Sequence, residues 1–154
     1  MIPITEIHPM LVHFPIVFWL SAETIALIVL LRGGSVSART QWPLTALYCL
    51  LAGLAFAILA ALFGDIALDH AVAAGFKAGP METHEAAAIT TIIIFGVHTI
   101  LRLLAVWRRY PLQGIRGFLA ELPGLLGIGS LLVTAYLGGG LVYHLGVNVA
   151  SVVH

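Results

Sequence analysis

Residues 43–63, PLTALYCLLAGLAFAILAALF, contain no charged side chain and decide the fold of this protein. A helix that crosses the hydrocarbon core of a bilayer needs about 20 predominantly apolar residues. Three further stretches have this length and character: residues 10–31, 86–105 and 122–143. Because lipid offers the backbone no hydrogen-bond partners, each stretch is expected to be helical. The sequence therefore predicts an all-α four-transmembrane-helix bundle, with residues 1–154 forming a single membrane domain.

The composition fits a lipid environment and excludes several classes of protein. Hydrophobic residues make up 60% of the chain and charged residues 9%, and the mean hydropathy is +1.05. About a quarter of an average soluble domain is charged. An ordinary soluble enzyme, a nucleic-acid binder with a basic patch and a disordered chain are therefore excluded. The single cysteine, Cys49, excludes a disulfide framework and a cysteine-built zinc site. The lipid bilayer is the expected partner, and nucleic acid is not.

The basic residues predict the orientation of the bundle. Six arginines lie near the first and third connections: Arg32, Arg39, Arg102, Arg108, Arg109 and Arg116. Lys77 alone lies near the second connection. Since basic residues mark the cytoplasmic side, both termini are expected outside the cytoplasm, in an N-out/C-out arrangement. We expect a multi-pass protein of the bacterial cytoplasmic (inner) membrane with its termini on the periplasmic side.

Histidines gather on the predicted outer side of the membrane. The chain has seven, and five of them lie near this interface: His8, His13, His70, His84 and His144. All four spans contribute to this group. Imidazole is the commonest metal ligand in proteins. A subset of the five is therefore a candidate site for haem iron or for a divalent metal ion.

The spacing of two histidines in the third span indicates a haem protein. His98 follows His84 by 14 positions, which is about 40° short of four helical turns and a rise of about 21 Å. This spacing is similar to that of the paired haem ligands in membrane b-type cytochromes. Haem b is the expected cofactor, and its candidate ligands are His13, His84, His98 and His144. Because no second helix carries a matching pair, an inner haem at His98 would need an unusual ligand or a second subunit.

Several short motifs resemble a bacterial membrane-protein family designated domain of unknown function 2231. The opening motif is HPMLVHFPI, residues 8–16, and the resemblance continues at residues 64–65, 83–85 and 138–147. It covers nearly the whole chain. In the closing motif of the family the histidine stands one position later than His144 does here. The resemblance implies a four-helix membrane protein with histidines at one face, and it implies no function.

Two charged side chains lie inside the predicted spans. Glu23, near the middle of the first span, is expected to be a neutral acid bonded to a neighbour, and its functional alternatives are a proton relay or a quinone-binding carboxylate. Arg102 lies one helical turn beyond His98 and is expected to extend toward the cytoplasmic surface. The second connection, residues 64–85, is acidic, which suits a divalent metal ion as well as a solvated loop.

Three functions fit these features. The first is a membrane-embedded haem b protein, similar to cytochrome b, that transfers electrons between an outer-side redox partner protein and the quinone pool as a subunit of a larger assembly. The second is a membrane protein that binds a divalent metal through the outer histidines. The third is a non-catalytic structural subunit.

Other features of the sequence narrow the enzymatic role and the assembly. The chain shows no nucleophile–base pair and no phosphate-binding loop, so the one enzymatic role favoured is an electron-transfer component of an oxidoreductase. Small residues in the second and fourth spans allow helices to pack closely in lipid, which suits a homo- or hetero-oligomer.

Overall fold

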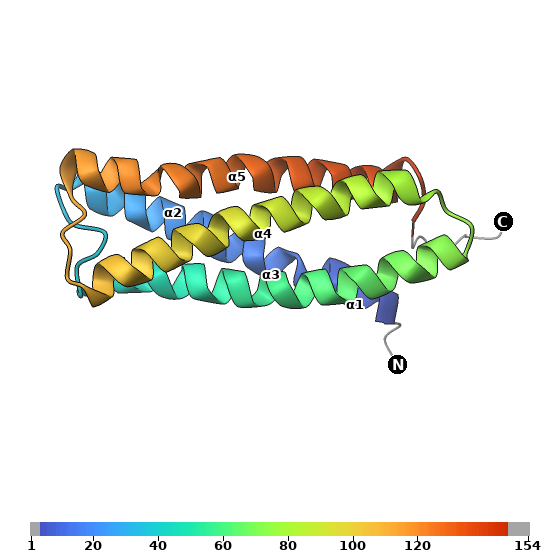
Figure 1. The fold of residues 1–154 in the computed structure, drawn as a ribbon, viewed down its shortest axis with the longest axis horizontal. Coiled ribbons are helices and arrows are strands. Elements are labelled where there is room, and N and C mark those ends of the chain that lie inside the picture. The colour runs from blue at the N-terminus through green and yellow to red at the C-terminus, as the bar shows by residue number, and fades with distance from the viewer. Residues whose placement is uncertain (1–3, 148–154) are drawn as a thin grey trace.

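The computed structural model describes residues 4–147, and every regular element in that range is a helix. The elements are α1 (Ile4–Leu11), α2 (His13–Leu31), α3 (Gln41–Ala73), α4 (Ala78–Trp107) and α5 (Gly114–Tyr143). In the elongated bundle of Figure 1, α2 packs on α3, α3 on α4, α4 on α5, and α5 on α2. Within the described residues four stretches are long and apolar enough to cross a membrane: Glu6–Leu31, Gln41–Ala73, Ala78–Trp107 and Gly114–Tyr143. The predicted all-α bundle with four candidate spans is confirmed.

The two ends of the bundle carry different side chains. The α2–α3 and α4–α5 connections lie together at one end, and α1, the α3–α4 connection and the last turn of α5 lie at the other (Figure 1). We call the first the arginine end, because its connections contain Arg32, Arg39, Arg108 and Arg109. We call the second the histidine end, because His8, His13, His70, His84 and His144 lie toward it.

A proline breaks the first span into α1 and α2. Pro15 has no N–H to donate to the carbonyl of Leu11, and its ring crowds that carbonyl, so the helix is interrupted at Val12. The break separates His8 from His13. In a continuous helix these two side chains would project about 140° apart. Val12 keeps helical backbone angles, with φ of −61° and ψ of −23°, and both side chains nonetheless line the same cavity.

Helices α3 and α4 are longer than the sequence predicted. We expected a connection over residues 64–85, whereas the structure confines it to residues 74–77. No helix-breaking residue follows Gly64 until Gly75, whose φ of +94° ends the helix in the left-handed conformation that glycine adopts readily. With 33 residues, α3 is about 50 Å long, which exceeds the hydrocarbon core of about 30 Å. The acidic side chains of this region therefore lie on a helical hairpin and not on a loop.

Hydrogen bonds join the two connections at the arginine end. The guanidinium of Arg39 donates from Nε and Nη2 to the carbonyl of Val106, at 3.2 and 3.1 Å, in the last turn of α4. Such carbonyls have no partner within their own helix. The hydroxyl of Ser37 donates to the carbonyl of Tyr110 at 2.5 Å and accepts from the N–H of Leu112 at 3.0 Å. These bonds tie the α2–α3 hairpin to the α4–α5 hairpin.

An aromatic pair fills the centre of the bundle. The rings of Trp19 on α2 and Phe95 on α4 stack with their centroids 4.0 Å apart and their planes 9° apart. Both side chains are buried. Glycines on the neighbouring helices make the space, because a Cβ atom at Gly53 would lie 2.5 Å from the Trp19 ring and one at Gly127 would lie 2.7 Å from the Phe95 ring. The pair divides the interior into a half toward the histidine end and a half toward the arginine end.

The close packing of Trp19 against Gly53 leads to a first prediction about stability. Gly53→Ala is expected to lower the free energy of unfolding by about 1–3 kcal/mol, because the added methyl group overlaps the indole and forces the core to shift. The measurement is thermal or chemical unfolding of the purified protein in detergent. Gly129→Ala on α5 is the matched control, since a Cβ atom there meets nothing within 4 Å. Equal stability of the two variants would contradict the packing described here.

Candidate functional site

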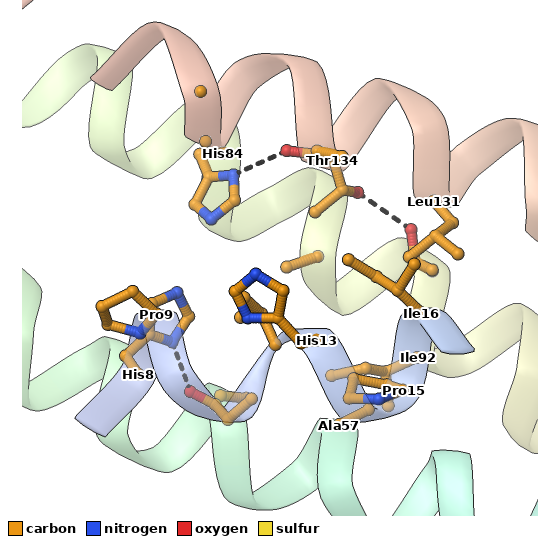
Figure 2. A pocket seen from close by; sticks show the side chains of 18 of the residues that line it. His8, Pro9, His13, Pro15, Ile16, Ala57, His84, Ile92, Leu131 and Thr134 are labelled. Atoms are coloured by element: carbon orange, nitrogen blue, oxygen red, sulfur yellow. Dashed lines mark hydrogen bonds between the residues drawn. The ribbon is translucent and has the colours of Figure 1, made fainter. Parts of the chain in front are cut away.

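A cavity of about 330 Å³ lies toward the histidine end of the bundle, between α1, α2, α3, α4 and α5. We call it the histidine cavity, because the imidazoles of His8, His13 and His84 line it (Figure 2). Most of the remaining lining is apolar, and its smallest members are Ala57, Ala60, Ala61, Ala88, Ala135, Gly138 and Gly139. The volume falls at the lower end of the range of small-molecule sites, about 300–1,000 Å³. An apolar space with a few convergent imidazoles suits a metal-containing ligand.

Two of the three imidazoles are oriented by backbone carbonyls. The Nδ1–H of His8 donates to the carbonyl of Ala60 on α3 at 2.7 Å, and the Nδ1–H of His84 donates to the carbonyl of Thr134 on α5 at 3.1 Å (Figure 2 draws both bonds). A donor at Nδ1 leaves Nε2 as the ring nitrogen with the free lone pair. Metal-ligating histidines are oriented in this way, with the second nitrogen bonded to a carbonyl or carboxylate.

The rings of His8 and His84 are spaced for a shared ion. Their centroids are 6.4 Å apart and their planes lie at 85° to each other. A metal ion bonded to one nitrogen of each ring at about 2 Å holds the two centroids roughly 6 Å apart. The two histidines come from different helices, α1 and α4, as the axial ligands on opposite faces of a haem do.

Two glycines make room for these rings. A Cβ atom at Gly64 on α3 would lie 2.8 Å from Nδ1 of His8, and one at Gly138 on α5 would lie 2.9 Å from Cε1 of His84. Both glycines belong to the short motifs noted in the sequence. The structure gives a physical reason for glycine at both positions, because any side chain there would push a cavity-lining imidazole out of place.

The other two histidines of the expected outer group do not enter the histidine cavity. His70 is exposed on α3 and bonds through Nδ1 to the carbonyl of Ile66 in its own helix, at 2.9 Å. His144 is exposed directly after α5 and lines a separate hollow with Tyr136 and Tyr143. The cavity therefore collects His8, His13 and His84 from the expected outer group and leaves out His70 and His144.

His98 lies in a second polar site, which we call the buried charge cluster: Glu23, His98, Arg102 and Glu121. Their exposed fractions are 4, 0, 1 and 0%. Nε2 of His98 lies 3.2 Å from Oε1 of Glu23 and 3.5 Å from Oε2 of Glu121. Nη1 of Arg102 donates to Oε1 of Glu121 at 2.6 Å, and its Nη2 donates to the carbonyl of Val36 at 2.7 Å. Four ionisable side chains from three helices thus meet inside the bundle.

This cluster corrects two expectations from the sequence. Arg102 does not reach the surface, because its guanidinium is buried and is held by Glu121 and by the carbonyl of Val36 in the α2–α3 connection. Glu121 was not singled out, since the fourth span was expected to begin at Leu122, whereas α5 begins at Gly114. An arginine inside a span needs a counter-charge. The signal that could have identified Glu121 is therefore Arg102, which requires an acidic side chain at the same level of the bundle.

The histidine cavity and the buried charge cluster lie on opposite sides of the aromatic pair. Trp19 lines the cavity, and Glu23 follows it one turn later on α2. His98 likewise follows Phe95 by one turn on α4. His84 and His98 both face the interior, yet they are about 21 Å apart along α4 and belong to two different sites.

The fold and these two sites define a small four-helix membrane protein with an imidazole-lined cavity at one end and a buried charge cluster toward the other. The chain belongs to the family described as predicted membrane protein (DUF2231), whose family model matches residues 5–151. The comparisons with curated proteins and with solved structures find no match. The resemblance noted in the sequence is confirmed.

Proposed function

We propose that this protein binds haem b in the histidine cavity and transfers electrons in the membrane, with the imidazoles of His8 and His84 as axial ligands. One observation carries the proposal: two imidazoles from different helices, each oriented through Nδ1 by a backbone carbonyl, face each other with centroids 6.4 Å apart. This pair differs from the one expected from the sequence, because His8 takes the place of His13 or His144. The exposed residue His13 provides a third imidazole that lines the same cavity.

The surroundings of the two imidazoles support a flat, apolar ligand. Alanines and glycines line the cavity on α3, α4 and α5, and such small side chains leave room for a macrocycle between helices. A haem with both axial positions filled by protein has no open position for oxygen, so its role is electron transfer. The protein then carries electrons between a redox partner protein at the histidine end and a quinone in the bilayer, as a subunit of an oxidoreductase assembly.

The orientation in the membrane follows from the basic residues. Arg32, Arg39, Arg108 and Arg109 belong to the two connections at the arginine end, whereas Lys77 belongs to the connection at the histidine end. The positive-inside rule therefore assigns the arginine end to the cytoplasm. In the inner membrane of a bacterium the histidine cavity then faces the periplasmic side, in the N-out/C-out arrangement, where a periplasmic partner reaches it.

A visible spectrum tests the proposal. The protein is purified in detergent without added chelator, and its absorption is recorded before and after reduction with dithionite. A Soret band with α and β bands that sharpen on reduction is expected. The metal content of the same sample tests the second candidate, a divalent ion such as Zn²⁺ held by the three imidazoles of the cavity. A colourless protein overturns the haem proposal, and the second candidate fails as well if His84→Ala does not lower the metal content.

The glycine behind His84 provides a second prediction. Gly138→Ala is expected to lower haem retention about 10-fold or more, because the added methyl group displaces the ring that it touches without removing a ligand. Haem retention is measured as Soret absorbance per protein after gel filtration. Gly140→Ala, two residues along α5, is the control, since its Cβ atom comes no closer than 3.9 Å to His144. Equal haem content in the two variants would contradict His84 as an axial ligand.

A further inference from the structure

The buried charge cluster contains polar atoms that have no hydrogen-bond partner. Among the described residues, the buried and unpartnered atoms of the cluster are both carboxylate oxygens of Glu23, both ring nitrogens of His98, Nε of Arg102 and Oε2 of Glu121. The distances of 3.2 and 3.5 Å between Nε2 of His98 and the two carboxylates are short, yet neither contact has hydrogen-bond geometry. Buried polar groups in native proteins nearly always have a partner, so such a group calls for an ion or a water molecule.

The net charge of the cluster is compatible with a bound cation. With a neutral His98, the side chains of Glu23, Arg102 and Glu121 sum to a net charge of −1 in an interior where an uncompensated charge is costly. A proton on His98 or on Glu23 brings this sum to zero, and so does a divalent metal ion with a hydroxide in its open position. A protonated imidazole would donate from its two nitrogens to the adjacent carboxylates. Neither nitrogen of His98 and neither carboxylate oxygen of Glu23 makes a hydrogen bond, as a proton on either residue would require, so the geometry favours a metal ion.

The spacing of the three ligand atoms fits a tetrahedral ion. One oxygen of Glu23, one oxygen of Glu121 and one nitrogen of His98 all lie within 4.8 Å of one another. Zinc binds carboxylate oxygen and imidazole nitrogen at about 2.0–2.2 Å, which places neighbouring ligands of a tetrahedral site about 3.4 Å apart. The measured separations of 3.2 and 3.5 Å lie on either side of that value.

Other residues hold these ligands in place. Arg102 binds Oε1 of Glu121, the oxygen that is not aimed at His98, and is itself held by the carbonyl of Val36. Such partners behind a ligand orient it toward the metal. Gly124 on α5 leaves the space that the carboxylate of Glu23 occupies, because a Cβ atom at that position would overlap it.

We propose that Glu23, His98 and Glu121 form a binding site for a divalent transition-metal ion of the Zn²⁺ type, separate from the histidine cavity. Three protein ligands are typical of zinc sites that keep a fourth position for water or substrate. The stacked rings of Trp19 and Phe95 lie between this site and the cavity. The proposal does not depend on haem, because none of the three ligands lines the cavity.

Metal counting in matched variants tests this site. The protein is purified from cells grown with added Zn²⁺, and its zinc content per chain is measured by mass spectrometry of the digested sample. About one zinc ion per chain is expected at this site, and it is expected to be lost in Glu23→Gln, His98→Gln and Glu121→Gln. Glu82→Gln, an exposed carboxylate on α4, is the control and retains it. His84→Ala also retains it, which distinguishes the cluster from the histidine cavity.

Thermal unfolding keeps the test decisive if a variant folds poorly. The unfolding midpoint of the wild-type protein is expected to fall after the bound metal is removed with a chelator and to return with Zn²⁺. Glu23→Gln, which is close in size to the native residue, is expected to show no such response while remaining helical by circular dichroism. A wild-type protein that contains no zinc, or the same zinc content in folded Glu23→Gln as in wild type, overturns the proposal.

Discussion

Replacing Arg102 by methionine is expected to lower the free energy of unfolding by about 3–5 kcal/mol. The guanidinium is 1% exposed and donates to Glu121 at 2.6 Å and to the carbonyl of Val36 at 2.7 Å. Methionine fills much of the same space, so the loss arises mainly from the uncompensated carboxylate that remains inside the bundle. The α2–α3 connection also loses its bond to α4. The measurement is chemical unfolding in detergent, in the presence of a chelator so that bound metal does not contribute.

Two further variants isolate the cause of that loss. Arg116→Met removes an exposed arginine from α5 and is expected to change stability by less than about 0.5 kcal/mol. The double variant Arg102→Met with Glu121→Met removes both charges of the pair. It is expected to be more stable than Arg102→Met alone, because no unpaired charge is left. If the single and double variants are equally stable, the buried ion pair is not what holds this part of the bundle.

His84→Ala is expected to abolish haem binding, the largest effect predicted for the histidine cavity. Without this imidazole one axial position of the iron loses its ligand, and the apolar lining alone does not hold the cofactor. The same loss is expected for His8→Ala, because its ring faces His84 at a centroid distance of 6.4 Å. Haem per chain is measured from the reduced spectrum after purification in detergent.

The exposed histidines supply the controls for this series. His70→Ala and His144→Ala are expected to retain full haem, since neither residue lines the histidine cavity. Circular dichroism of each variant checks that the helices remain. Full haem in His84→Ala, or its loss in His144→Ala, would show that the ligand assignment is wrong.

The long apolar stretches made the architecture predictable. Each span needs only to be apolar and long enough, which is a local property that composition reveals. The ends of α3 and α4 were not predictable in the same way, because charges such as Asp65 and Asp69 were taken to end a span. A helix can extend beyond the hydrocarbon core. Helix α3 continues to Ala73 and ends where Gly75 adopts the left-handed conformation.

The candidate sites were predictable only in part. The positions of His13 and His84 along the chain indicated the histidine end, whereas the pairing of His84 with His8 depends on how the bundle brings α1 and α4 to the same cavity. His144 was among the expected ligands and does not line the histidine cavity, since it is exposed directly after α5.

The sequence by itself determined that this protein is an all-helical membrane bundle, that arginines mark one end and that histidines mark the other. These properties follow from the length, hydropathy and order of the segments along one chain. Only the tertiary structure decided that Arg102 pairs with Glu121 and that His98 lies between Glu23 and Glu121. The physical reason is that a buried charge is stabilised by whichever opposite charge the packing brings close, and that partner lies on another helix.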